Sequence, residues 1–195
     1  MIKRLFDIIF SLIGLVIFFP LMLLIACLIK VTSLGSIFFI QERVGQYSKP
    51  FNMIKYRSMS IDSDKMNSIS VKGDERITRI GVFLRKYKLD ELPELWNVLV
   101  GDMSFVGPRP DVSGYADKLE GEDMLILELR PGITSKASLK YANEEGILAL
   151  QADPVKYNDD VIYPDKVKLN LDYFHNNSLL GDIKIIFATI FRTSY

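Results

Sequence analysis

Residues 80–110 read IGVFLRKYKLDELPELWNVLVGDMSFVGPRP and combine a basic run, two adjacent carboxylates and an apolar helical pattern. After the carboxylates, four apolar residues recur with the i, i+3, i+4, i+7 spacing of one helix face: Leu92, Leu95, Trp96 and Leu99. Pro93 has no N–H to donate and is tolerated within a first turn, so we expect Asp90 at or near the N-cap. The helix should end at Gly101, before a rigid Gly-Pro-Arg-Pro loop at 107–110.

The acidic pair Asp90-Glu91 has two interpretations. It can be an acidic helix start that complements the helix dipole. Alternatively, it can be a carboxylate nucleophile beside a metal-binding neighbour, at a helix start where backbone N–H groups also receive phosphate. Three nearby cations favour the second interpretation, because they suit a phosphate-bearing substrate: Arg85, Lys88 and Arg109.

The composition argues against several classes of site. The 195 residues contain 24 Lys plus Arg and 24 Asp plus Glu, so no overall basic charge points to nucleic acid. One cysteine, Cys27, leaves nothing for a disulfide or a thiolate metal site. One histidine, His175, offers little for a zinc site or a Ser-His-Asp triad. Neither GxxxxGK[ST] nor GxGxxG occurs, which argues against P-loop and dinucleotide-binding proteins.

The first part of the chain is apolar. Ile8–Ile29 has no charged residue, and a run of about 22 residues can cross a bilayer core. A spanning helix is the default interpretation, and no small-residue cleavage site supports a signal peptide. However, Phe19-Pro20 interrupts the run, and basic residues flank it on both sides: Lys3 and Arg4 before, and Lys30, Arg43, Lys49 and Lys55 after. Two basic flanks favour a re-entrant helix that bends at the proline and returns to the same face, with Ser11 as a possible partner for the freed carbonyls.

Residues 36–45 and 50–59 are predicted to form two short strands around a turn at 45–50. Lys55 and Arg57 alternate with apolar neighbours, so both fall on one face of the second strand, which by itself is typical of a solvated surface. Asn143-Glu144-Glu145 is expected to be a solvated acidic face. Residues 178–192 form an amphipathic helix that could pack in the core, although the apolar residues near its end favour the membrane interface.

The block LDELPELWNVLVGDMSFVGPRP, residues 89–110, resembles the signature region of the bacterial sugar transferases, the small monotopic phosphoglycosyl transferases. The resemblance continues at Lys55-Tyr-Arg-Ser-Met, at Arg85, at Arg130-Pro-Gly-Ile-Thr, and at Leu169–Phe174, which is similar to an L-D-x-x-Y segment. Members of this family transfer a sugar 1-phosphate from a nucleotide diphosphate sugar to a polyprenyl phosphate. Two segments depart from the family pattern: Phe19 stands where serine is common, and 135–141 replaces a Gly-Trp-Ala-Gln segment, so donor identity is not carried over.

The resemblance implies roles for individual residues. Asp90 is the expected nucleophile of a ping-pong reaction that releases UMP from a UDP-sugar, and Glu91 is the expected ligand of a Mg²⁺ cofactor. Cations would stabilise the phosphoryl oxygens: Lys55, Arg85 and Arg109. Asp172 is a secondary candidate that would orient a cation or a sugar hydroxyl, and a surface aspartate is the alternative.

The expected fold is mostly α with a short β-hairpin (α+β), in a monotopic membrane protein with a re-entrant, proline-broken N-terminal helix and interfacial amphipathic helices. Residues 1–32 would form the re-entrant helix and 33–195 a catalytic domain on the cytoplasmic face of the bacterial inner membrane. The expected partners are a nucleotide-sugar donor, undecaprenyl or another polyprenyl phosphate, membrane lipid and, in a homo-oligomer, a second copy of the chain, but no nucleic acid. The alternative function is a non-catalytic membrane-anchored scaffold of a glycan assembly complex.

Overall fold

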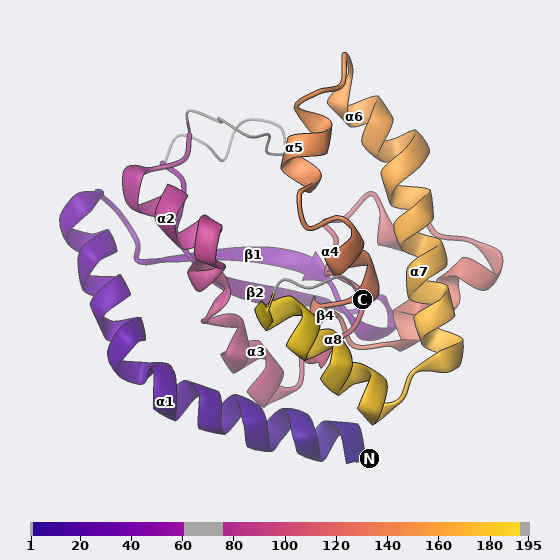
Figure 1. Ribbon diagram of the computed structural model, residues 1–195, viewed down its shortest axis with the longest axis horizontal. Helices are drawn as coiled ribbons and strands as arrows, with labels where there is room; N and C mark the ends of the chain where they lie inside the picture. The colour runs from indigo at the N-terminus through magenta and orange to yellow at the C-terminus, as the bar shows by residue number, and fades with distance from the viewer. Residues whose placement is uncertain (1, 61–75, 192–195) are drawn as a thin grey trace.

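The structure is a computed structural model that describes residues 2–60 and 76–191. It is mostly helical with two small sheets, which confirms the α+β prediction (Figure 1). The first part comprises α1 (Ile2–Thr32), β1 (Phe38–Val44), η1 (Gln46–Ser48), β2 (Pro50–Tyr56), α2 (Arg79–Tyr87), η3 (Leu89–Glu91), α3 (Glu94–Val100) and β3 (Ser104–Val106). The second part comprises η4 (Ala116–Lys118), η5 (Gly121–Glu128), β4 (Gly132–Thr134), α4 (Lys136–Lys140), α5 (Glu144–Leu148), α6 (Pro154–Tyr157), η6 (Asn158–Ile162), α7 (Tyr163–Asn176) and α8 (Leu179–Phe191).

Helix α1 is one continuous helix with Pro20 inside it, and it bends about midway along its length (Figure 1). It is long and apolar enough to cross a membrane, judged by length and composition alone. Most of its apolar side chains face away from the protein, and its buried residues are Asp7, Ser11, Ile25 and Ile29. A large exposed apolar surface marks an interaction site, here one suited to lipid. Whether the helix re-enters the same face of a bilayer stays a prediction.

The polar residues of α1 fasten its first half to the protein. Lys3 Nζ donates to Val106 O at 3.0 Å and forms an ion pair with Asp182. Arg4 donates to the carbonyls that end α3, Val98 O at 2.5 Å and Leu99 O at 2.7 Å. Lys3 and Arg4, which were expected to form the basic flank before the apolar run, therefore bind groups of the protein. Ser11, suggested as a partner for carbonyls freed at Pro20, instead donates to Asp7 O at 2.6 Å, one turn before it.

The predicted hairpin is confirmed, with β1 and β2 antiparallel and Phe38 opposite Tyr56 at its open end. The Asn97 side chain on α3 joins the hairpin to the helix: Asn97 Oδ1 accepts from Ile54 N at 3.1 Å, and Asn97 Nδ2 donates to Asn52 O at 2.8 Å. These two hydrogen bonds fix the position of β2 against α3. Lys55, the residue after Ile54, therefore faces the start of α3.

The second sheet was not predicted. Strands β3 and β4 are parallel, with Ser104 opposite Gly132 and Val106 opposite Thr134. The backbones at Gly107 and Gly132 approach so closely that a Cβ on Gly132 would lie 2.1 Å from Gly107 N. Only glycine permits such an approach. The Arg-Pro-Gly segment at 130–132 therefore leads into β4, and Gly132 N donates to Pro108 O at 2.7 Å, which ties it to the Gly-Pro-Arg-Pro loop.

The start of one helix differs from the prediction. Helix α3 begins at Glu94, after Pro93, and Asp90 lies earlier, in the 3₁₀ turn η3, so it does not cap α3. The predicted end at Gly101 is confirmed, with this glycine in the left-handed region at φ 104°. Helix α8 ends at Phe191, and residue 192 of the predicted segment lies outside the described residues. Exposed apolar side chains dominate the outer face of α8: Leu180, Phe187, Ile190 and Phe191.

Candidate active site

The acidic pair lies in η3, a short turn between α2 and α3 that packs beside α1. Helix α2 ends at Tyr87, and its C-cap residue Lys88, with a φ of 58°, lies in the left-handed region and reverses the chain. Leu89 and Leu92, on either side of Asp90-Glu91, pack against the buried cluster that contains Ile25 and Ile29 of α1. The same cluster includes Tyr56, whose hydroxyl donates to Met22 O at 2.7 Å. The carboxylates are therefore held beside α1 by apolar packing on both sides.

Glu91 is almost fully buried and surrounded by cations. Its Oε1 lies 3.0 Å from Lys55 Nζ, 2.9 Å from Arg109 Nη2 and 4.0 Å from Lys88 Nζ. Burial alone would raise the pKa of Glu91, but these positive charges outweigh it and hold that pKa well below its ordinary value. Glu91 is therefore ionised at neutral pH.

Asp90 has the opposite electrostatic environment. Its side chain is buried, and its Oδ1 has no hydrogen-bond partner within 2–60 and 76–191. Burial raises the pKa of Asp90, the neighbouring charge of Glu91 raises it further, and the charges of Lys55, Lys88 and Arg85 partly offset both. A desolvated carboxylate oxygen without a bound donor is more reactive as a nucleophile than one held by several hydrogen bonds.

A third carboxylate, Glu94, belongs to this cluster and was missed by the sequence reasoning. Glu94 is 2% exposed, and its Oε1 lies 3.1 Å from Lys55 Nζ, so Lys55 bridges Glu91 and Glu94. Burial raises the pKa of Glu94, and the attraction of Lys55 acts against this rise. Its position three residues after Glu91, which puts both on one side of a helical turn, was the available signal.

The expected cations divide into two groups. Lys55, from β2, and Arg109, from the loop after β3, meet at Glu91 Oε1, and the negative charge of Glu91 raises the pKa of Arg109. Arg85, on α2, forms an ion pair with Glu145 at the start of α5, while its charge still acts on Asp90. Glu145 therefore helps place a site cation, although its segment was expected to be a plain solvated face.

Two other residues lie apart from the cluster. Asp172, on α7, accepts from Lys136 Nζ at 2.7 Å and from Asn176 Nδ2 at 2.9 Å, so its recorded partners lie outside the acidic turn. Arg57 falls just beyond β2 and donates to Ser33 O at 3.0 Å, at the end of α1. Lys55 and Arg57, which were predicted to share one strand face, therefore bind different parts of the protein: Lys55 binds the acidic turn and Arg57 binds the end of α1.

The oxygen ligands of the turn suit a hard cation such as Mg²⁺. Among the described residues, no group of three or more Asp, Glu, His or Cys side chains forms a protein-only metal site. Mg²⁺ does not require one, because it commonly binds one or two carboxylates together with substrate phosphates. All the ion pairs recorded for Glu91 use Oε1, and the buried Asp90 Oδ1 next to it has no partner among the described residues. The donor set therefore fits Mg²⁺.

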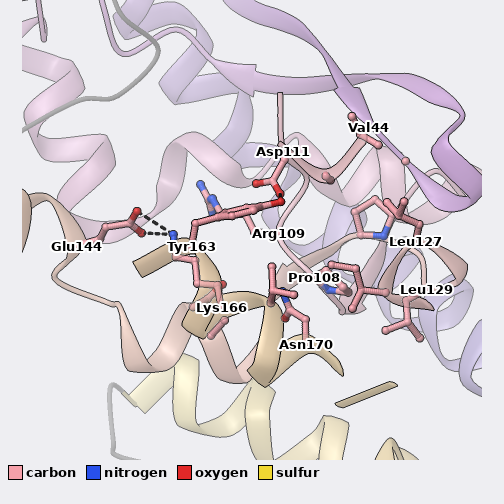
Figure 2. Close-up of a pocket in the computed structure, with 17 residues that line it drawn as sticks. Val44, Pro108, Arg109, Asp111, Leu127, Leu129, Glu144, Tyr163, Lys166 and Asn170 are labelled. Carbon is pink, nitrogen blue, oxygen red and sulfur yellow. Dashed lines mark hydrogen bonds and ion pairs between the residues drawn. The ribbon is translucent and has the colours of Figure 1, made fainter. Parts of the chain in front are cut away.

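A pocket adjoins the cluster, and Arg109 belongs to both. Its polar lining includes Asp111, Glu144, Tyr163, Lys166 and Asn170, and its apolar wall includes Pro108, Leu127 and Leu129. Figure 2 shows the Tyr163 side chain reaching toward Asp111 with Arg109 behind it, while Lys166 pairs with Glu144. The site as a whole thus combines a cation-lined acidic turn, a neighbouring polar pocket and the long apolar helix α1.

The comparison with known families covers this whole region. The profile of the family described as "Bacterial sugar transferase" matches residues 1–194. The chain belongs to the bacterial sugar transferase family. The block at 89–110 that suggested the family thus carries the acidic turn, α3, β3 and Arg109.

Several curated relatives of this chain have names that state an activity or a pathway. The UDP-N-acetylgalactosamine-undecaprenyl-phosphate N-acetylgalactosaminephosphotransferase of Aeromonas hydrophila is 37% identical over 97% of this chain and 43% of its own length. The UDP-glucose:undecaprenyl-phosphate glucose-1-phosphate transferase of Klebsiella pneumoniae is 37% identical over 97% of this chain and 39% of its own length. The exopolysaccharide production protein ExoY of Rhizobium meliloti is 32% identical over 97% of this chain and 84% of its own length. The chain therefore spans less than half of the first two relatives and most of the third.

Proposed function

We propose that this chain transfers a sugar 1-phosphate from a UDP-sugar to undecaprenyl or another polyprenyl phosphate and releases UMP. The observation that carries the proposal is the position of the acidic turn, in which Asp90 and Glu91 lie among cations while Leu89 and Leu92 pack on α1. A charged, water-soluble donor and a lipid-borne acceptor can meet only where a charged site adjoins a membrane element. The names of the relatives support the same two substrate classes.

The proposed reaction has two half-reactions. An Asp90 carboxylate oxygen attacks the sugar-bearing phosphorus, the bond from that phosphorus to the oxygen of UMP breaks, and UMP leaves with the electron pair. An oxygen of the polyprenyl phosphate then attacks the same phosphorus and breaks its bond to Asp90, which restores the carboxylate. Taking the two anionic substrates in turn avoids holding both at one site. The raised pKa of Asp90 suits this role because a more basic carboxylate is a stronger nucleophile.

The cations around the turn would stabilise charge on the phosphoryl oxygens. Lys55 and Arg109 already converge on Glu91, and Arg85 and Lys88 act on Asp90 from α2 and its end. Fixed positive groups in a buried site need no reorganisation as charge develops in the transition state. Mg²⁺, held by Glu91 and the donor's phosphate oxygens, would neutralise the diphosphate when bound.

The membrane placement is part of the same proposal. We infer that residues 1–32 form a re-entrant helix and that 33–195 lie on the cytoplasmic face of the bacterial inner membrane, where the chain would carry out the first membrane step of surface glycan assembly. The bend of α1 and its exposed apolar surface support a shallow insertion that keeps Asp90 near the lipid headgroups (Figure 1).

The test is mass spectrometry of protein quenched after mixing with a UDP-sugar alone. We expect a phosphosugar adduct on Asp90 and release of UMP, and Asp90→Asn should lose both, with turnover falling at least about a thousandfold. Asp160→Asn, which neutralises an exposed carboxylate on η6, is the matched control and should behave as the unsubstituted protein. Substantial turnover by Asp90→Asn would overturn the covalent route. No UMP release from any UDP-sugar would instead favour the scaffold alternative.

A further inference from the structure

The pocket beside the acidic turn is joined to it by one side chain. Arg109 Nη2 lies 2.9 Å from Glu91 Oε1, and Arg109 also lines the pocket formed with α7 and the segments around β4. A phosphorus held for attack by Asp90 would therefore lie near one end of this pocket. The group bonded directly to that phosphorus is the sugar, whereas the nucleoside is one phosphate further away.

The pocket lining offers both donors and acceptors without a strong net charge. Asp111 and Glu144 are acceptors, Lys166 is a donor, and Tyr163 and Asn170 can act as either. Lys166 Nζ contacts both oxygens of Glu144 at 2.7 Å, so these two charges compensate each other. A sugar has several hydroxyl groups that each donate and accept, and this lining matches that pattern more closely than it matches a free phosphate.

The hydrogen bond between Tyr163 and Asp111 is one that a ligand hydroxyl can replace. Tyr163 Oη donates to Asp111 Oδ2 at 3.3 Å, which is long for an O–H···O bond. Burial raises the pKa of Asp111 to about 6, and the charges of Lys166, Arg43 and Arg109 oppose the rise. At neutral pH the carboxylate is therefore ionised, and two neighbouring sugar hydroxyls could both donate to it.

The lining is poorly suited to a nucleobase. Among the described residues that line the pocket, Tyr163 is the one aromatic side chain, and its ring packs against Tyr115 with centroids 5.0 Å apart. Stacking on aromatic faces is the usual way in which proteins hold an unpaired base. The opposite wall is instead aliphatic, from Pro108, Leu127 and Leu129 (Figure 2), and it can cover the C–H face of a sugar ring.

We propose that this pocket binds the sugar of the donor, with Asp111, Tyr163 and Asn170 as the residues that recognise its hydroxyl groups. This proposal rests on the proposed function, because it assumes a nucleotide-sugar donor whose sugar-bearing phosphorus lies at Asp90. Ser138, from the segment 135–141 that departs from the family pattern, also lines the pocket. The pocket therefore sets which sugar this chain accepts.

The test compares UDP-sugars with UDP, which is the same ligand without its sugar. Dissociation constants are measured by calorimetry for UDP-glucose, UDP-N-acetylgalactosamine and UDP with the full chain in detergent. For the UDP-sugar that the unsubstituted chain binds most tightly, we expect Asp111→Asn and Tyr163→Phe to raise the dissociation constant roughly tenfold or more. The dissociation constant for UDP should change by less than about twofold, because UDP lacks the sugar that would contact Asp111 and Tyr163.

Controls separate this result from loss of fold and from failure of the proposed function. Tyr163→Phe keeps the ring and its packing on Tyr115, and Asp160→Asn removes a carboxylate three residues away that does not line the pocket. Equal weakening of UDP and UDP-sugar, or unchanged binding of both by folded variants, would overturn the sugar site. If the sugar-dependent weakening is found but the unsubstituted chain releases no UMP, the transfer function fails while the sugar site stands.

Discussion

Asp90 and Glu91 are neighbours in the chain, yet their surroundings shift their pKa values in opposite directions. Glu91 has two cations within hydrogen-bonding distance of one oxygen, whereas Asp90 has a buried oxygen with no partner among the described residues. This divergence separates two chemical roles within one dipeptide. It supports Glu91 as the carboxylate that stays charged and Asp90 as the carboxylate that forms and then breaks a bond to phosphorus.

The raised pKa of Asp90 predicts how the first half-reaction depends on pH. Only the ionised carboxylate can attack phosphorus, so the rate should fall as pH is lowered through a pKa above the ordinary aspartate value of 3.8. Single-turnover UMP release measured against pH checks this, with Asp160→Asn as the control. A rate that stays level down to the ordinary aspartate pKa would contradict the assignment.

Glu91 and Glu94 allow a matched test of the metal ligand. Both are buried carboxylates about 3 Å from Lys55 Nζ, so Glu91→Gln and Glu94→Gln each remove one partner of the same cation. We expect Glu91→Gln to raise the Mg²⁺ concentration needed for half-maximal rate roughly tenfold or more, because ligand changes act on metal affinity. Glu94→Gln should lower the rate by misplacing Lys55 and leave the Mg²⁺ requirement unchanged. Equal shifts in the Mg²⁺ requirement would contradict the assignment of Glu91.

At the scale of elements, the first turn of α1 and the second half of the chain are joined by a partly buried ion pair. Lys3 pairs with Asp182 of α8, and Tyr173 of α7 donates to the same carboxylate at 2.5 Å. Asp182→Ala leaves Lys3 and Tyr173 without this partner, and we expect it to lower the free energy of unfolding by about 3 kcal/mol. Denaturant titration in detergent, followed by circular dichroism, measures the change.

The exposed pair between His175 and Glu122 provides the control for that prediction. Its Glu122 side chain is 67% exposed, so Glu122→Ala should change the free energy of unfolding by less than about 1 kcal/mol. Equal effects of the two substitutions would mean that the Lys3–Asp182 contact does not fasten α1 to the domain.

At the scale of the whole molecule, exposed apolar surface on α1 and α8 predicts how the chain meets a membrane. In a Cys27→Ser background, Ile2→Cys and Tyr47→Cys place single thiols at exposed positions, one at the first residue of α1 and one after the helix. A re-entrant helix keeps both thiols on the cytoplasmic face, so a membrane-impermeant maleimide should label both in inverted vesicles and neither in spheroplasts. A spanning helix would give opposite accessibility at the two positions.

The sequence alone determined those features that depend on local pattern. The apolar run interrupted by Pro20 predicted a long bent helix, alternation predicted the hairpin at 36–59, and Gly101 predicted the end of α3, because each follows from backbone geometry over a few residues. The block at 89–110 also pointed to the acidic pair and its cations.

Only the tertiary structure decided which of these groups meet. It placed Lys55 between Glu91 and Glu94, turned Lys3 and Arg4 into the protein, and paired Asp172 with Lys136. It also paired β3 with β4 through the close backbone approach of two glycines 25 positions apart. Contacts between distant segments depend on how whole elements pack, and charge compensation in a buried site depends on distances that no local pattern encodes.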